Sequence, residues 1–154
     1  MRTVILVDTC IFLNVLDVPA FNQDRDATLT KLGQLARSDA NLLLPFAAIV
    51  ETGNHIAQLA DGNQRRVYAL KFVRQVQAAI AGEAPWTPTQ SVDTETVGSW
   101  LNEFPDHAMR GIGLGDLSII KEWEAACKRH PNYRVYIWSL DGGLTGYDRA
   151  ARII

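Results

Sequence analysis

A short aliphatic run that ends in an acid constrains the fold of this chain more than any other feature. Val4-Ile5-Leu6-Val7 contains no polar residue, and Asp8 follows it directly. A short, unbroken apolar run is typical of a strand that is buried on both faces. Such strands occur in parallel sheets that carry helices on each side, so we expect an α/β fold.

The rest of the chain alternates between the two kinds of element. Further strands are expected at 42–45 and 133–140. The proline-rich stretch 82–89 predicts a loop, 105–115 should be irregular, and about a turn of helix should follow Gly142-Gly143. Helices are expected at about 11–18, 24–38, 46–59, 63–81, 94–104 and 116–130. Strands separated by helices predict parallel pairing, hence a three-layer α/β/α sandwich with a central parallel sheet.

Length and composition indicate one globular domain over 1–154. The chain is 47% hydrophobic and 21% charged, which argues against disorder. No apolar stretch approaches the ~20 residues of a membrane span, and the aliphatic run near the start is too short for a signal peptide. Two cysteines, Cys10 and Cys127, suit a reduced interior better than a disulfide framework. We therefore expect a soluble, cytoplasmic protein without a membrane partner.

The net charge of −2 argues against strong non-specific binding of nucleic acid. If four of the 17 acids bind metal, however, 13 remain against 15 Lys and Arg. Divalent ions would neutralise those four, and the rest of the molecule would be mildly positive.

Four acids are candidates for chemistry. Asp8 and Asp141 stand at the carboxyl ends of the first and last expected strands, where parallel sheets collect ligands. Each could instead be a turn residue or helix cap. Asp116 opens a helix after alternating glycines, and an N-cap is the simpler interpretation. Glu51 lies in an otherwise apolar helix, where an ion pair with His55 is the alternative to a functional role.

Together, the four carboxylates favour a metal site. Carboxylates that share a pocket repel one another unless cations lie between them. Oxygen ligands favour Mg²⁺ or Mn²⁺, and the three histidines lack zinc spacing. A pair of such ions would support hydrolysis of a phosphodiester bond.

The ordered set of these motifs resembles the PIN-domain nucleases over essentially the whole chain. The motifs are Val7-Asp8-Thr9 closing a strand, Glu51 in a helix after Leu-Leu-Pro, Gly115-Asp116-Leu-Ser-Ile-Ile opening a helix, and Ser139-Leu-Asp141 closing a strand. The segment around 82–110 looks like an insertion relative to compact members. Where many members carry a further acid, this chain has Gly143.

The resemblance implies a PIN-like fold and a function. Asp8, Glu51, Asp116 and Asp141 would be catalytic and would hold one or two Mg²⁺ or Mn²⁺ ions, with Thr9 and Ser139 supporting the cluster. The activity would be that of a phosphodiesterase (EC 3.1 class), an endoribonuclease that cuts single-stranded RNA, with DNA as the alternative substrate. Many small members are toxins of toxin–antitoxin pairs, which implies an antitoxin partner and a homodimer.

Substrate contacts are expected from basic residues. Arg66, Lys71 and Arg74 share an arc of one expected helix, and Arg110 precedes the glycines. They could form a phosphate track, although a solvated helix face is the more common meaning of such a pattern. Trp86 or Tyr68 could offer a surface for base stacking.

Two other functions remain open at this stage. Haloacid-dehalogenase-like phosphatases also begin with a buried strand and an Asp, but their second Asp is replaced here by Cys10. A PIN-like domain kept only for interactions would have no use for a repulsive cluster of four acids. A rise in melting temperature with Mn²⁺ would separate the nuclease from such a module.

Overall fold

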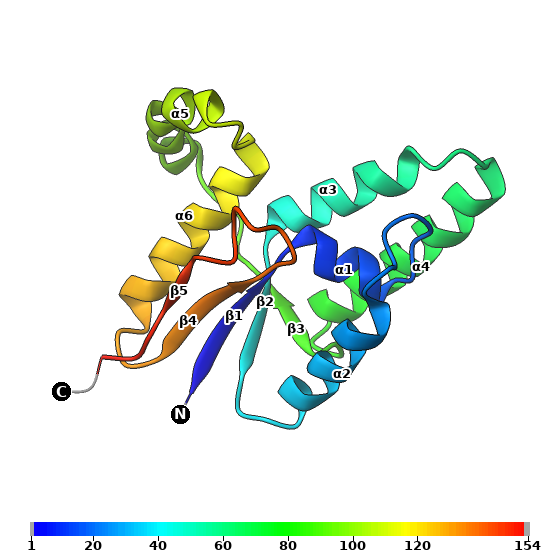
Figure 1. Cartoon of the computed structure of the whole chain (residues 1–154), viewed down its shortest axis with the longest axis horizontal. Helices are drawn as coiled ribbons and strands as arrows, with labels where there is room; N and C mark the ends of the chain where they lie inside the picture. Colours follow the sequence, from blue (N-terminus) through cyan, green and yellow to red (C-terminus); the bar gives the residue numbers. More distant parts are fainter. Residues whose placement is uncertain (1, 153–154) are drawn as a thin grey trace.

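The computed structural model describes residues 2–152 and contains a five-stranded sheet with helices on both faces (Figure 1). The strand order is β3-β2-β1-β4-β5, and β5 alone among them is antiparallel to its neighbour. The strands are β1 (Thr3–Val7), β2 (Asn41–Leu44), β3 (Trp86–Pro88), β4 (Arg134–Trp138) and β5 (Asp148–Arg149). This confirms the expected α/β/α sandwich with its largely parallel central sheet.

The helices fall into two groups around the sheet. One face is covered by α1 to α4, while α6 covers the other and α5 packs on α6 (Figure 1). The helices are α1 (Thr9–Val15), α2 (Arg25–Ala36), α3 (Phe46–Ala57), α4 (Gly62–Ile80), α5 (Thr94–Met109) and α6 (Leu114–Arg129). Within residues 2–152, every helix is too short or too polar to span a membrane.

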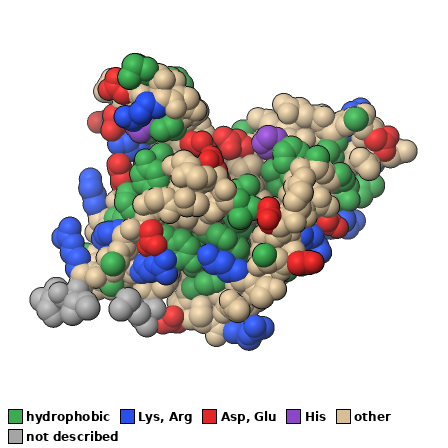
Figure 2. All heavy atoms as spheres, in the orientation of Figure 1, with side chains coloured by type: hydrophobic (Ala, Val, Ile, Leu, Met, Phe, Trp, Pro, Cys, Tyr) green, Lys and Arg blue, Asp and Glu red, His purple; other side chains and the backbone are tan. Residues whose placement is uncertain are grey.

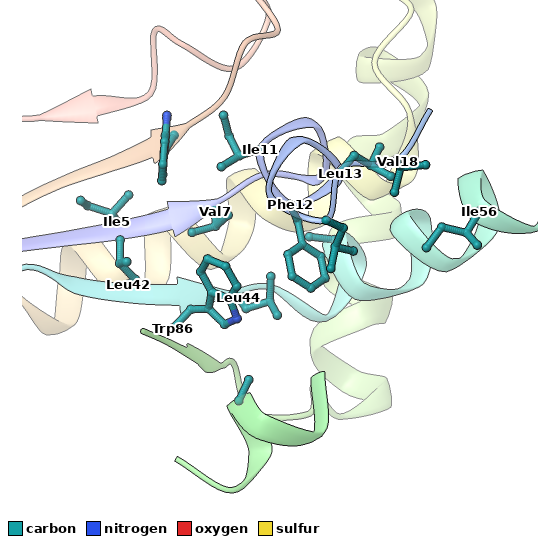
Figure 3. Packing of buried hydrophobic residues seen from close by; sticks show 14 of the residues in the cluster. Ile5, Val7, Ile11, Phe12, Leu13, Val18, Leu42, Leu44, Ile56 and Trp86 are labelled. Carbon is teal, nitrogen blue, oxygen red and sulfur yellow. The ribbon is translucent and has the colours of Figure 1, made fainter. Parts of the chain in front are cut away.

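The β1 strand shows why its sequence is continuously aliphatic. Ile5 and Val7 belong to the core cluster on the α1–α4 side, where Figure 3 shows Ile5 near Leu42 and Val7 near Leu44 and Trp86. Val4 and Leu6 belong to a second cluster, under α6. Successive side chains of a strand point to opposite faces, so a strand with helices on both sides must be apolar throughout.

The expectation of a loop over 82–89 holds for residues 82–85 but was wrong for residues 86–88, which form the edge strand β3. Trp86 pairs with Leu42 of β2 and is only 2% exposed. Its ring meets that of Phe12 edge-on, with the centroids 5.4 Å apart. An edge strand tolerates proline, since one side of its backbone needs no partner in the sheet. Burial of the indole therefore outweighed the turn signals.

Two further local expectations were incomplete. Helix α5 continues through Pro105 to Met109, although Pro105 cannot donate the usual helical hydrogen bond. After β4, the N–H groups of Leu144 and Thr145 donate to the Asp141 carbonyl, so about one helical turn forms as expected, but it leads into the unexpected strand β5. The Arg149 guanidinium donates to three backbone carbonyl oxygens at the end of α6 and before β4, which fastens this last strand.

Candidate functional site

The candidate site lies where the carboxyl ends of β1 and β4 meet the second turn of α3 and the first turn of α6. Parallel neighbours end at the same edge of a sheet, so acids that follow them in sequence come together there. Figure 2 shows acidic side chains gathered, with a histidine close by, in the hollow between the α6 and α3 regions.

Asp8 is the most buried member of the site, with 5% of its surface exposed. Its backbone N–H donates to the Trp138 carbonyl at 3.0 Å, which continues the β1–β4 pairing to the strand end. It occupies the N-cap position of α1, but its side chain makes no capping hydrogen bond within residues 2–152. The helix-cap explanation for Asp8 is therefore wrong.

Ser139 and Cys10 hold the Asp8 carboxylate. The Ser139 hydroxyl donates to Asp8 Oδ2 at 2.6 Å and accepts from the Asp141 N–H at 2.9 Å. The Cys10 thiol donates to the same carboxylate oxygen at 3.4 Å. Burial, followed by the nearby charge of Asp8, raises the pKa of the Cys10 thiol to about 11, so it stays protonated as a donor. Ser139 thus makes the contact expected of a supporting residue.

Glu51 reaches the site from α3. The Thr9 hydroxyl donates to Glu51 Oε2 at 2.9 Å, a contact that joins α1 to α3. The alternative partner, His55, instead packs its ring 4.8 Å from that of Phe21. A Cβ atom built on Gly115 would overlap Glu51 Oε1, so glycine at this position lets the Glu51 carboxylate lie against α6, and a larger residue would push it aside.

Asp116 is the third residue of α6, and Gly113 holds the N-cap position. The N-cap interpretation of Asp116 is therefore wrong. Partial burial raises the pKa of Asp116 from 3.8 to about 6, and the charges of Asp8, Glu51 and Asp141 add to the rise. The four acids predicted from the sequence are thus close enough to influence one another.

Asp141 forms the exposed rim of the cluster, in the turn after β4. Its side chain accepts a hydrogen bond from the Gly143 N–H at 2.9 Å, so the expected turn role is present. Where many PIN proteins would carry another acid, Gly143 contributes this backbone donor instead.

The donor chemistry of the cluster fits Mg²⁺ or Mn²⁺, since carboxylate oxygens are the ligands that both ions prefer. Within residues 2–152, no three His, Cys, Asp or Glu side chains already converge on one point that could hold an ion. Asp8, Glu51 and Asp141 each accept a hydrogen bond from a donor within the protein.

A cavity of about 380 Å³ opens beside the cluster. Glu51 and Asp116 line it together with Asn54, His55 and Gln58 of α3. Sequence reasoning missed Asn54 and Gln58 as site residues, although both share a helical face with Glu51 at spacings of three and seven. Cys10 was also missed, and its position two residues after Asp8 carries no signal for this role.

The basic residues expected to form a phosphate track do not lie together but line different pockets. Arg66 lines a groove between α3 and α4. Lys71 and Arg74 line a different pocket, near the end of α1. Arg110 ends α5, three residues before Gly113 at the acidic cavity.

Of the two aromatic residues considered for base stacking, Trp86 is excluded by its burial in the core. Tyr68 is partly buried and lies under the Lys71 ammonium, 4.8 Å from the ring centroid.

Comparison with known proteins supports the fold. No protein-family model matches the sequence, and no curated protein matches it. The chain is similar to the crystal structure of FitAcB from Neisseria gonorrhoeae, with 20% identity and a TM-score of 0.55 over 93% of this chain and 91% of that one. It is also similar to VapBC2 from Rickettsia felis, with 16% identity and a TM-score of 0.51 over 88% of this chain and 99% of that one. The fold is therefore PIN-like.

Proposed function

We propose that this chain is a metal-dependent nuclease that hydrolyses phosphodiester bonds at the cluster of Asp8, Glu51, Asp116 and Asp141. The observation that carries the proposal is the convergence of the four acids: Ser139 links Asp8 to Asp141, and Glu51 and Asp116 line one cavity. In agreement with this geometry, burial, followed by the charges of the other three acids, raises the pKa of Asp116. Holding like charges together costs folding free energy, and such arrangements are concentrated at functional sites.

The four carboxylates would hold one or two Mg²⁺ or Mn²⁺ ions. When bound, such ions lower the pKa of water and stabilise the charge that develops on a phosphodiester. The chain itself orients the ligands, because the Ser139 and Thr9 hydroxyls donate to Asp8 and Glu51. Because burial and the neighbouring acids raise the pKa of Asp116 to about 6, protons and metal ions would compete for its carboxylate.

We infer that the substrate is single-stranded RNA, with DNA as the alternative. The resemblance of the sequence motifs to PIN nucleases supports this choice. The cavity beside Glu51 and Asp116 offers neutral hydrogen-bonding groups from Asn54 and Gln58, which suit sugars and bases.

We also infer that the chain is the toxin of a toxin–antitoxin pair and binds a cognate antitoxin. The PIN-like fold, shared with FitAcB and VapBC2, supports this role. The VapBC2 structure was determined bound to a DNA fragment from their promoter, and by analogy the partner of this chain would bind promoter DNA. Expression of the wild type alone should arrest growth, and Asp8→Asn should remove that arrest.

The cleavage test compares one single-stranded RNA with DNA of the same sequence, in Mn²⁺ and in EDTA. We expect RNA cleavage that requires metal and falls to background in Asp8→Asn and Asp116→Asn. Asp106→Asn, on an exposed part of α5, is the matched control and should cleave normally. Cleavage by Asp8→Asn at the wild-type rate would refute the catalytic assignment.

A melting experiment tests the metal separately from cleavage. Mn²⁺ at 100 times its Kd should stabilise the wild type by about 2.7 kcal/mol. Asp8→Asn should lose most of this stabilisation, and Asp106→Asn should keep it. A wild type that does not respond to Mn²⁺ or Mg²⁺ would indicate an interaction module instead.

A further inference from the structure

A second cavity, of about 280 Å³, lies on the α6 side of the sheet and is separate from the acidic cluster. Leu6 and Leu43 line it from the sheet, while Glu122, Arg129 and Trp100 line it from α6 and α5. Glu122 follows Asp116 by six residues on α6, which corresponds to roughly 9 Å along the helix axis. A strand that binds at the acidic cluster would have to follow α6 over this distance, and round to a different face of the helix, to place a nucleotide in this cavity.

The Glu122 carboxyl group is incompletely satisfied. Its Oε2 atom is buried and accepts no hydrogen bond from residues 2–152. Burial raises the pKa of Glu122, while the Thr89 hydroxyl and the charge of Arg129 act in the opposite direction. A buried carboxylate oxygen without a donor is costly, so a ligand that supplies N–H groups would bind here favourably.

The other charged groups of this cavity are engaged within the protein. Lys121 forms ion pairs with Glu103 and Glu124. Asp93 caps α5 by accepting from the Thr96 N–H at 2.7 Å. Glu122 and Arg129 remain for a ligand, one as an acceptor and the other as a cation.

An acceptor at Glu122 and a cation at Arg129 together select the chemistry of the ligand. A cationic ligand would meet Glu122 but be repelled by Arg129, whereas a nucleotide presents a neutral base edge and an anionic phosphate. Guanine carries two adjacent donors, N1–H and the N2 amino group, which match the two oxygens of a carboxylate. Adenine, cytosine and uracil place an acceptor beside the donor on that edge. Trp100 adds an aromatic surface on which a base can stack.

We propose that the cavity between α5, α6 and the sheet binds a guanine nucleotide, with Glu122 accepting from the base and Arg129 facing the phosphate. The guanine would come from the substrate strand or from a free nucleotide. A guanine from the substrate strand rests on the proposed nuclease function and would give the nuclease a base preference near the cleaved bond. Binding of a free guanine nucleotide does not depend on that function.

Calorimetric titration of the full chain with GMP in EDTA tests the cavity without metal at the acidic cluster. GMP should bind at least about 10-fold more tightly than AMP, CMP or UMP. Glu122→Gln should weaken the binding of GMP by a similar factor, because it removes a charged acceptor. Arg129→Gln should weaken the binding of GMP but leave the affinity for guanosine, which has no phosphate, unchanged. Equal binding of the four nucleotides, or of GMP to wild type and Glu122→Gln, would overturn the proposal.

Ala125→Leu provides a second variant, because Ala125 lines the cavity and is exposed on α6. Its larger side chain should block GMP while the melting temperature stays near that of the wild type. Retained GMP binding in this variant would also refute the proposal.

Competition with short RNAs distinguishes the two sources of guanine. Using Asp116→Asn so that RNA stays intact, displacement of GMP only by a guanine-containing oligomer assigns the cavity to the substrate strand. GMP binding without such displacement assigns it to a free nucleotide. Metal-dependent cleavage without GMP binding would refute this inference alone, whereas GMP binding without any cleavage would refute only the proposed nuclease function.

Discussion

Replacing Asp116 by Asn should stabilise the metal-free protein, since the amide removes a charge that the fold holds at a cost. The pKa of Asp116 rises from 3.8 to about 6 on folding. Each pKa unit corresponds to about 1.4 kcal/mol, so the full shift would be about 3 kcal/mol. Asp116 is only half-buried, and solvent screening reduces this to about 1 kcal/mol. For a domain of this size, that is a rise in Tm of roughly 2–4 °C.

The pH dependence gives this prediction a distinctive sign. A carboxyl group whose pKa is raised by folding keeps its full stability contribution below pH 3.8 and loses it as the pH rises through 6. The stability advantage of Asp116→Asn should therefore be complete above pH 6 and absent below about pH 4. Asp106→Asn, on exposed α5, should show no such pH-dependent gain.

Thermal melts in EDTA across this pH range measure the effect directly. Adding Mn²⁺ should reverse the order of the two proteins, because the wild type gains binding free energy that Asp116→Asn cannot. If Asp116→Asn were less stable than the wild type at pH 7.5 in EDTA, the four carboxylates would not repel one another and the reasoning would fail.

Three further variants test other parts of the structure. Gly115→Ala should fold but bind Mn²⁺ at least about 10-fold more weakly than the wild type, because the added Cβ displaces Glu51. Gly98→Ala is the control, since a Cβ at this position of α5 meets no atom within 4 Å, and it should bind Mn²⁺ as the wild type does. Trp86→Ala should lower the free energy of unfolding in urea by about 3–5 kcal/mol, whereas Trp86→Phe should cost less because it fills most of the same space. Arg149→Met should lower it by about 2 kcal/mol through three lost backbone contacts, and an unchanged urea midpoint would contradict that role.

The acids could be found from the sequence because each lies at the end of, or within, an element with a strong local pattern. Asp8 ends an unbroken aliphatic strand and Glu51 interrupts an apolar helix, which marks both as out of place without a partner. The rule that ligands collect at the carboxyl ends of parallel strands then brings them together. Their roles as metal ligands stay a prediction that the variants above would test.

The partners of those acids could not be found in the same way. Cys10 reaches Asp8, and Glu122 Oε2 has no donor among residues 2–152, because of how α1 and α6 pack against the sheet. Likewise, Arg66 and Lys71 look like neighbours on one helix, yet they line different pockets since α4 contacts different elements around its circumference.

What the sequence determined by itself is the α/β alternation and the identity of the four acids, because hydrophobic periodicity and misplaced charge are local properties. Only the tertiary structure decided that Trp86 is a core residue on an edge strand, that Gly115 makes room for Glu51, and that residues 148–149 add the strand β5 to the sheet. Each of these depends on burial against residues distant in the chain. Burial free energy of that kind exceeds the weak local preferences of prolines and glycines, which is why their turn signals misled.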